Sequence, residues 1–385
     1  MRRRIIRWCG TACVAAALVA VCRGEARADN DRAPAGAAID VLSPEQQRGM
    51  EASIDRALAW MATQQQKDGS FAGHEGGQPG ITSLCIMAFL SRGHLPGRGP
   101  YGAHLNKALE FVLSCRKPDG LICKLTPGPT YGGQEDASHS GLYNHAISGL
   151  MLCEAYGTTD AEQAQRIRRA VDQAISTALK FQKERKRNTT DLGGWRYVRR
   201  TWGFDSDLSV TSWHLLFLRA AKNSGFEVPT QAVMDGLAYT KRCWDPQKQV
   251  FLYTIPVDYN LPKRACAGMG ILSLSMAGEH NSPMAQEAGQ WILRHSFTPY
   301  NEGHQWDRYH YGVFYCTQAM FQLGGRYWQQ FFPPLVTTLL ANQGRDGSWQ
   351  PEARGNNAIF GNVYTTSLVV IALATPYQLL PIFQR

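Results

Sequence analysis

Two helical patterns of hydrophobic and polar positions alternate along this chain. In the first, apolar residues recur at i, i+3 or i+4 and i+7, which is typical of a helix with one face in water. It occurs over residues 53–65, 104–115, 168–182, 230–242, 285–295 and 329–343. In the second, a small or polar residue precedes an almost unbroken apolar run, which indicates a buried helix. It starts at Thr82, His145, Thr211, Cys266, Thr317 and Thr366. No stretch has the alternation of a strand, so the sequence predicts an all-α protein.

A turn signal follows the exposed helices. The clearest copies are QQKDGSF at residues 65–71 and QGRDGSW at residues 343–349, and weaker copies start at Arg116, Asp191 and Asp245. Each combines a turn dipeptide with a following apolar or aromatic residue. The order exposed helix, turn, buried helix repeats about every fifty residues. It predicts a closed double ring of six inner and six outer helices. We expect one domain over residues 43–385, with an inserted loop at about 123–139.

The first 28 residues resemble an export signal. Four arginines precede an apolar stretch at about residues 11–21, and Ala26-Arg27-Ala28 has the small-x-small form of a cleavage site. We therefore expect an exported protein, periplasmic or extracellular, with a flexible segment at residues 29–42. The arginines also fit the twin-arginine pattern loosely, so the export route stays open. No apolar stretch reaches the roughly 18 residues that span a bilayer. Contact with a membrane surface remains compatible with the sequence.

The positive charge belongs largely to this signal. Residues 1–28 contain six arginines and one glutamate, so their removal lowers the formal net charge from +9 to +4. The remainder gives no electrostatic basis for binding nucleic acid. The seven cysteines outside the signal are scattered and form no CxxC pair. They indicate small buried apolar residues rather than a disulfide framework or a zinc finger.

The two DGS turns and the sixfold layout carry a family resemblance. In these features the chain resembles the prenyltransferase and squalene-oxidase repeat family, which includes squalene cyclases, the β subunits of protein prenyltransferases and the thioester domains of complement-like proteins. The turns look like the QW motif of the cyclases, and the resemblance covers nearly all of residues 43–383. It implies an (α/α)6 toroid. Whether the chain is an enzyme stays open, because one fold hosts different functions. An active member would be a terpenoid cyclase-like isomerase or lyase.

The stretch GFDSDLSVTSW at residues 203–213 is the first candidate site. Cyclases carry an Asp-x-Asp-Asp motif at the start of an inner helix, and the resemblance implies Asp207 as proton donor with Asp205 as its partner. Leu208 stands where the third acid would be. The loss of one carboxylate changes the charge and the hydrogen bonding of such a cluster. The structural interpretation is that Asp207 caps the following helix by accepting its free N–H groups. Both interpretations stay open.

Aromatic residues near the starts of the buried helices are candidates for substrate contact, because their faces stabilise a cation. The alternative is packing, since these side chains bury a large area. The candidates are Trp213, Tyr143, Trp306, Tyr309, Tyr311 and Phe314, with His145 in a comparable position. For His145, the alternative is a hydrogen-bonded role in the core.

A zinc site is what the prenyltransferase branch would imply. Cys266, Asp307 and His310 are weak candidates for its ligands. Arg264 stands where an aspartate belongs, and His310 is out of register. A catalytic zinc site needs three well-placed protein ligands. We therefore expect no metal and no other cofactor.

Three functions follow as hypotheses. The first is a squalene-cyclase-like enzyme acting on an isoprenoid, which requires a dry aromatic pocket with Asp207 at its floor. The second is a non-catalytic toroid that binds a lipid, peptide or glycan, with a filled ring centre or a shallow rim groove. The third is a carbohydrate-active enzyme, which requires two facing carboxylates. That pair would combine Asp205 or Asp207 with Glu135, Asp136 or Asp307. We expect a hydrophobic small molecule as ligand, and the sequence identifies no protein partner.

Overall fold

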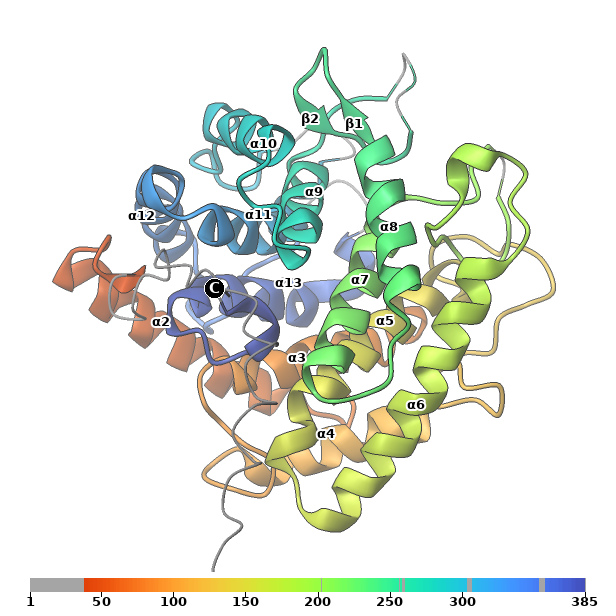
Figure 1. The fold of residues 1–385 in the computed structure, drawn as a ribbon. Coiled ribbons are helices and arrows are strands. Elements are labelled where there is room, and N and C mark those ends of the chain that lie inside the picture. The colour runs from red at the N-terminus through yellow and green to blue at the C-terminus, as the bar shows by residue number, and fades with distance from the viewer. Residues whose placement is uncertain are drawn as a thin grey trace, which may run out of the picture. The chain divides into compact units, whose positions relative to one another are not determined.

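A computed structural model describes residues 38–201, 203–255, 257, 260–302, 307–352 and 357–384. Its α-helices alternate between an inner and an outer layer (Figure 1). The inner helices are α3 (Gly80–Leu90), α5 (Ala137–Ala155), α7 (Leu208–Asn223), α9 (Arg264–Met276), α11 (Tyr309–Leu323) and α13 (Asn357–Leu373). The outer helices are α2 (Pro44–Thr63), α4 (Gly102–Ser114), α6 (Ala161–Lys183), α8 (Thr230–Arg242), α10 (Pro283–Arg294) and α12 (Gly325–Ala341). The short elements are the antiparallel pair β1 (Trp244–Asp245) and β2 (Val250–Phe251) and the 3₁₀ helices η1 (Glu75–Gly77), η2 (Tyr156–Thr158), η3 (Thr189–Asp191), η4 (Thr375–Tyr377) and η5 (Pro381–Phe383).

The inner helices close into a ring. Each packs against the next in the order α3, α5, α7, α9, α11 and α13, and α13 packs back against α3. Every residue of α3 is buried, whereas α6 buries one face and exposes the other. This difference is the one that the two sequence patterns predict. The all-α (α/α)6 toroid expected from the sequence is therefore confirmed. No helix in the described part of the chain is both long and apolar enough to cross a membrane.

A recurrent hydrogen bond involves a threonine in each of three inner helices. The backbone N–H of the turn aromatic donates to a threonine hydroxyl of the inner helix that follows. The distance is 3.0 Å in each of three repeats, for Phe71 to Thr82, Trp195 to Thr211 and Trp349 to Thr366. The bond satisfies a buried N–H group and fixes the turn against the helix start.

A second recurrent contact joins neighbouring repeats through a glutamine. Nε2 of Gln65 donates to the carbonyl of Gly69 in its own turn at 3.1 Å and to that of His104 on the next outer helix at 2.8 Å. Gln182 makes the equivalent pair of bonds. Gln343 donates to Gly347 and to the carbonyl of Ser53 on α2, both at 2.9 Å. This last contact joins the final repeat to the first.

The second repeat differs from the sequence expectation at one boundary. Helix α5 begins at Ala137 rather than near His145, because Asp136 is its N-cap and accepts the N–H of Ser138 at 2.7 Å. The inserted stretch without helix is therefore residues 123–136 instead of 123–139. The earlier start adds two turns to α5 and places His139 and Tyr143 on an inner helix.

The C-terminal segment closes one end of the ring. Helix η5 packs against α7, and the ring of Phe383 lies 5.9 Å from that of Phe314. Gln322, near the end of α11, donates to the carbonyl of Phe383 at 3.0 Å. Because Leu380, Ile382 and Phe383 are buried here, the C-terminal ends of the inner helices surround packed side chains.

Candidate functional site

A cavity lies inside the inner ring at the N-terminal ends of the helices. All six inner helices contribute to its wall, and two adjoining parts have empty volumes of about 590 and 750 Å³. Residues lining both parts are Gln134, His139, Tyr143, Ser209, Arg308 and Tyr311. The part toward α13, called here the α13 side, adds Gly77, Gly80, Ile81, Ser140, Asn144, Ile147, Trp213, Phe360 and Tyr364. The other part, the α9 side, adds Tyr197, Tyr253, Lys263, Ala265, Cys266 and Met269.

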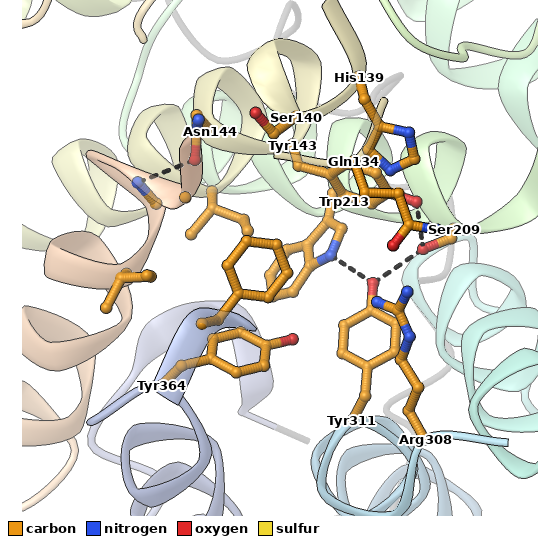
Figure 2. Close-up of a pocket in the computed structure, with 15 residues that line it drawn as sticks. Gln134, His139, Ser140, Tyr143, Asn144, Ser209, Trp213, Arg308, Tyr311 and Tyr364 are labelled. Atoms are coloured by element: carbon orange, nitrogen blue, oxygen red, sulfur yellow. Dashed lines mark hydrogen bonds between the residues drawn. The ribbon is translucent and has the colours of Figure 1, made fainter. Parts of the chain in front are cut away.

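A chain of hydrogen bonds crosses the wall between the two parts (Figure 2). Trp213 Nε1 donates to the hydroxyl of Tyr311 at 2.7 Å, and that hydroxyl lies 2.8 Å from Ser209 Oγ. The hydroxyl of Tyr143 donates to Ser209 Oγ at 3.1 Å. Three predicted aromatic residues, Trp213, Tyr143 and Tyr311, are thus brought together from α7, α5 and α11. Their polar atoms are satisfied, so the wall is held in one arrangement.

An uncharged histidine, His139, lies beside this chain of hydrogen bonds. The ring of His139 is 3.8 Å from that of Tyr197, centroid to centroid, and Nδ1 lies 3.0 Å from the hydroxyl of Tyr131. Burial lowers the pKa of His139 to about 3, and the nearby Arg308 and Arg196 act in the same direction. The imidazole is therefore neutral at physiological pH.

Two cations face the cavity. Lys263 and Arg308 are half-buried, and Nζ of Lys263 lies 4.6 Å from the centre of the Tyr253 ring. Neither side chain has a hydrogen bond or an ion pair with another described residue. None of the described residues that line the cavity is Asp or Glu. The cavity thus combines aromatic faces with two cations that have no counter-ion among the described residues.

Asp207 lies in the wall of the ring and does not line the cavity. Its side chain is the N-cap of α7, with Oδ1 accepting the N–H of Val210 at 2.8 Å. Oδ2 accepts Nη1 of Arg196 at 3.0 Å. Burial raises the pKa of Asp207, and Arg196 opposes that effect. The geometry is that of the structural interpretation, a cap, with a buried ion pair added to it.

Asp205 does not line the cavity either and forms an ion pair with Arg187. Both oxygens accept from this guanidinium, at 2.7 to 3.0 Å, and one also accepts the backbone N–H of Arg187 at 2.6 Å. Burial opposes the effect, but these bonds hold the pKa of Asp205 below its usual range. Asp205 and Asp207 are therefore each committed to a different arginine.

Tyr309, Phe314 and His145 lie outside the cavity wall. Tyr309 donates its hydroxyl proton to the carbonyl of Phe297 at 2.7 Å, and Phe314 stacks on Trp213 at 5.3 Å. His145 accepts the N–H of Ile122 at Nδ1 and donates from Nε2 to the carbonyl of Ala174. Trp306 lies outside the described residues.

The weak zinc candidates have separate partners. Asp307 pairs with Arg264 at 2.6 Å, and His310 lies 3.2 Å from a carboxylate oxygen of Glu352. Cys266 lines the α9 side, where burial raises the pKa of its thiol to about 12. The described part of the chain contains no group of three His, Cys, Asp or Glu residues that could hold a metal ion.

Sequence reasoning missed His139, Ser209, Lys263 and Arg308 as cavity residues. For two of them a signal exists. Lys263 and Arg308 each stand immediately before an inner helix, at the N-caps of α9 and α11. A cation is unfavourable at that position because the helix dipole is positive there. A cation at this unfavourable position in two neighbouring repeats could have indicated a binding site.

Comparison with known proteins gives a likeness of fold. No family model and no curated protein matches the sequence. The type II terpene cyclase MstE from Scytonema, in complex with merosterolic acid A, is 15% identical with a TM-score of 0.53, over 89% of this chain and 100% of its own. A GH76 α-mannanase from Bacteroides thetaiotaomicron is 9% identical with a TM-score of 0.56, over 89% and 98%. The α-1,6-mannanase GH76A of a Salegentibacter species, in complex with α-1,6-mannotriose, is 10% identical with a TM-score of 0.57, over 87% and 99%. The chain is therefore an α/α toroid with the fold of type II terpene cyclase and of the GH76 mannanases.

Proposed function

We propose that this exported toroid binds an isoprenoid or a similar hydrophobic molecule in its ring cavity without protonating it. The observation that carries the proposal is the composition of the wall. It offers aromatic faces and aliphatic side chains, and no carboxylate among its described residues. The terpene cyclase with the same fold has geranylgeranyl dihydroxybenzoate as its substrate. That likeness supports a prenylated molecule as the first ligand to test.

The α13 side of the cavity suits an apolar chain. Ile81, Ile147 and Phe360 supply aliphatic and aromatic surface there, and Trp213 closes the wall between α7 and α11. Burying such a chain is favourable by about 25 cal/mol for each Å² of apolar surface removed from water. The packed C-terminal segment at the other end of the ring supports a blind cavity rather than a channel.

Cyclisation is the second candidate function, favoured by the position of Asp207 at the start of an inner helix. It would require the Asp207 carboxyl to be protonated and directed at the substrate. Its present partners, Arg196 and the N–H of Val210, both favour the ionised form. A sugar-cleaving reaction has less support, because it needs two carboxylates facing one another across the cavity.

The test uses the mature chain, beginning at Asp29, and three uncharged probes: farnesol, geranylgeraniol and squalene. We expect saturable binding of at least one probe in isothermal titration calorimetry. Ile147→Phe fills the α13 side and should weaken that binding at least tenfold. Met234→Phe adds the same ring at an exposed position of α8 and should leave binding unchanged. Absence of binding by all three probes would refute the proposal.

The same incubations separate binding from cyclisation. Extracts are analysed by mass spectrometry for cyclised isomers, with Asp207→Asn as the comparison and a thermal melt of each sample. The proposal expects bound probe recovered unchanged. A cyclised product from the wild type, lost in a variant that still folds, would establish the cyclase instead.

A further inference from the structure

We propose that the ligand of this cavity carries an anionic headgroup, a carboxylate or a phosphate, which binds between Lys263 and Arg308. The inference rests on the proposed function and specifies the polar end of the molecule. Lys263 lines the α9 side, and Arg308 lines both sides. A single headgroup on the α9 side could therefore contact both cations while its chain extends toward α13.

The two cations stand at the N-terminal ends of their helices. Lys263 and Arg308 are the N-caps of α9 and α11, and neither side chain bonds the helix that it precedes. The N-termini of α5 and α7 instead have the caps Asp136 and Asp207. A cation at a helix N-terminus repels the positive end of the dipole. An anion bound there would be attracted by the side chain and by the helix end together.

The carboxylates of Asp307 and Asp207 are already paired with arginines. Arg264 follows Lys263 in sequence, and its Nε lies 2.6 Å from Asp307. Arg196, in the wall behind Tyr197, is paired with Asp207 at 3.0 Å. These pairs neutralise the wall arginines and leave Lys263 and Arg308 without a counter-ion among the described residues. Half-buried cations in a confined cavity attract an anion more strongly than cations on an open surface.

The rest of the described wall is uncharged. His139 lies between the two parts of the cavity and stays neutral, with a pKa lowered to about 3 by burial and by the neighbouring arginines. Tyr143 and Tyr253 are half-buried, and burial raises the pKa of both hydroxyls well above the usual range. The wall thus presents two positive charges with hydroxyl and imidazole groups beside them. Such a surface favours a ligand with an acidic headgroup over an alcohol that has the same hydrocarbon chain.

The experiment compares three probes with one hydrocarbon chain: farnesol, farnesoic acid and farnesyl monophosphate. Dissociation constants are measured by calorimetry for the wild type, Lys263→Gln, Arg308→Gln, the double variant and Lys222→Gln. Lys222 is an exposed lysine near the other end of α7 and serves as the matched control. A thermal melt establishes that each variant is folded.

We expect the wild type and Lys222→Gln to bind at least one anionic probe about tenfold or more tightly than farnesol. Each single substitution should reduce this preference, and the double substitution should abolish it. Added salt should weaken the binding of the anionic probe and leave the binding of the alcohol unchanged. The anion that binds more tightly identifies the headgroup as carboxylate or phosphate.

Two results would overturn the inference, and they differ in what they say of the proposed function. If the wild type binds all three probes equally, or if the preference survives in the double variant, the headgroup site is wrong and the hydrophobic cavity stands. If no probe binds, farnesol included, the proposed function fails and the inference fails with it.

Discussion

Nη1 of Arg196 lies 3.0 Å from Oδ2 of Asp207, while Oδ1 of the same carboxylate accepts the N–H of Val210. The residue in the place of a cyclase acid is thus the counter-ion of an arginine and the cap of α7. The carboxylate of Asp207 is fully buried and the side chain of Arg196 is partly buried, so each contact stabilises the wall of the ring and favours the ionised carboxylate.

Asp207→Asn should therefore destabilise the protein. Asparagine still caps a helix well, so the cap is retained, but Arg196 loses its counter-ion in a buried position. We expect the free energy of unfolding in urea to fall by about 3 kcal/mol. Adding Arg196→Gln to this variant should restore part of the loss. Equal stability of the variant and the wild type would mean that the pair does not stabilise the fold.

Glu154, near the end of α5, should make stability depend on pH. It is buried with one long hydrogen bond, from the N–H of Ile382 at 3.5 Å, and burial raises its pKa to about 8. Between about pH 4.5 and 8, the folded state keeps a proton that the unfolded state releases. Stability should therefore fall as pH rises through this window and level off above it.

The variant Glu154→Gln tests this dependence. It should be more stable than the wild type at pH 8, by about 4 kcal/mol, and similar to it near pH 4.5. Denaturant titrations at three pH values give the comparison, with Glu162→Gln at an exposed position of α6 as the control. A difference between Glu154→Gln and the wild type that does not change with pH would contradict the assignment.

Gln343→Ala should weaken the junction between the last and the first repeat. It removes bonds to the carbonyls of Ser53 and Gly347, both part-buried. We expect a loss of about 2 kcal/mol in the free energy of unfolding. Gln66→Ala, an exposed glutamine beside the turn of the first repeat, should cost less than about 0.5 kcal/mol. Similar losses in the two variants would argue against a special role for the junction.

Lys263→Gln and Arg308→Gln should stabilise the ligand-free protein slightly. Each removes a cation from the positive end of a helix, and the expected gain is about 0.5 kcal/mol per substitution. The gain should shrink at high salt, because screening already weakens the repulsion. A lowered melting temperature in both variants would mean that these side chains stabilise the empty protein.

The fold could be predicted from sequence because its signals are local. The sequence of a turn, such as residues 65–71, predicts that turn, and the apolar run after Thr82 predicts a buried helix. The number of repeats then predicts a closed ring of six units. The weakest prediction concerned the second repeat, where the cap of α5 at Asp136 precedes a polar segment, Ser138 to Ser140, that interrupts the apolar pattern.

The cavity could be predicted only in part, because its wall combines residues that are far apart in sequence. Tyr143, Ser209 and Tyr311 meet through hydrogen bonds across three helices, and no local pattern reports that meeting. Two aromatic residues one turn apart on the same face of a helix can also lie at different depths in the ring. Tyr311 lines the cavity, whereas Phe314 packs behind Trp213 toward the closed end of the ring.

The bond from Gln343 to Ser53 has a consequence for how such a chain can vary. An open solenoid can gain or lose a repeat at either end, since each unit touches only its neighbours. Here the last unit is also a neighbour of the first. Adding a seventh unit, or removing one of the six, would separate the two. The number of units is thereby fixed by geometry, and changes in length must enter through connections such as residues 123–136. In this repeat that connection also supplies Gln134 to the cavity, so growth of the chain and change of ligand can occur in the same segment.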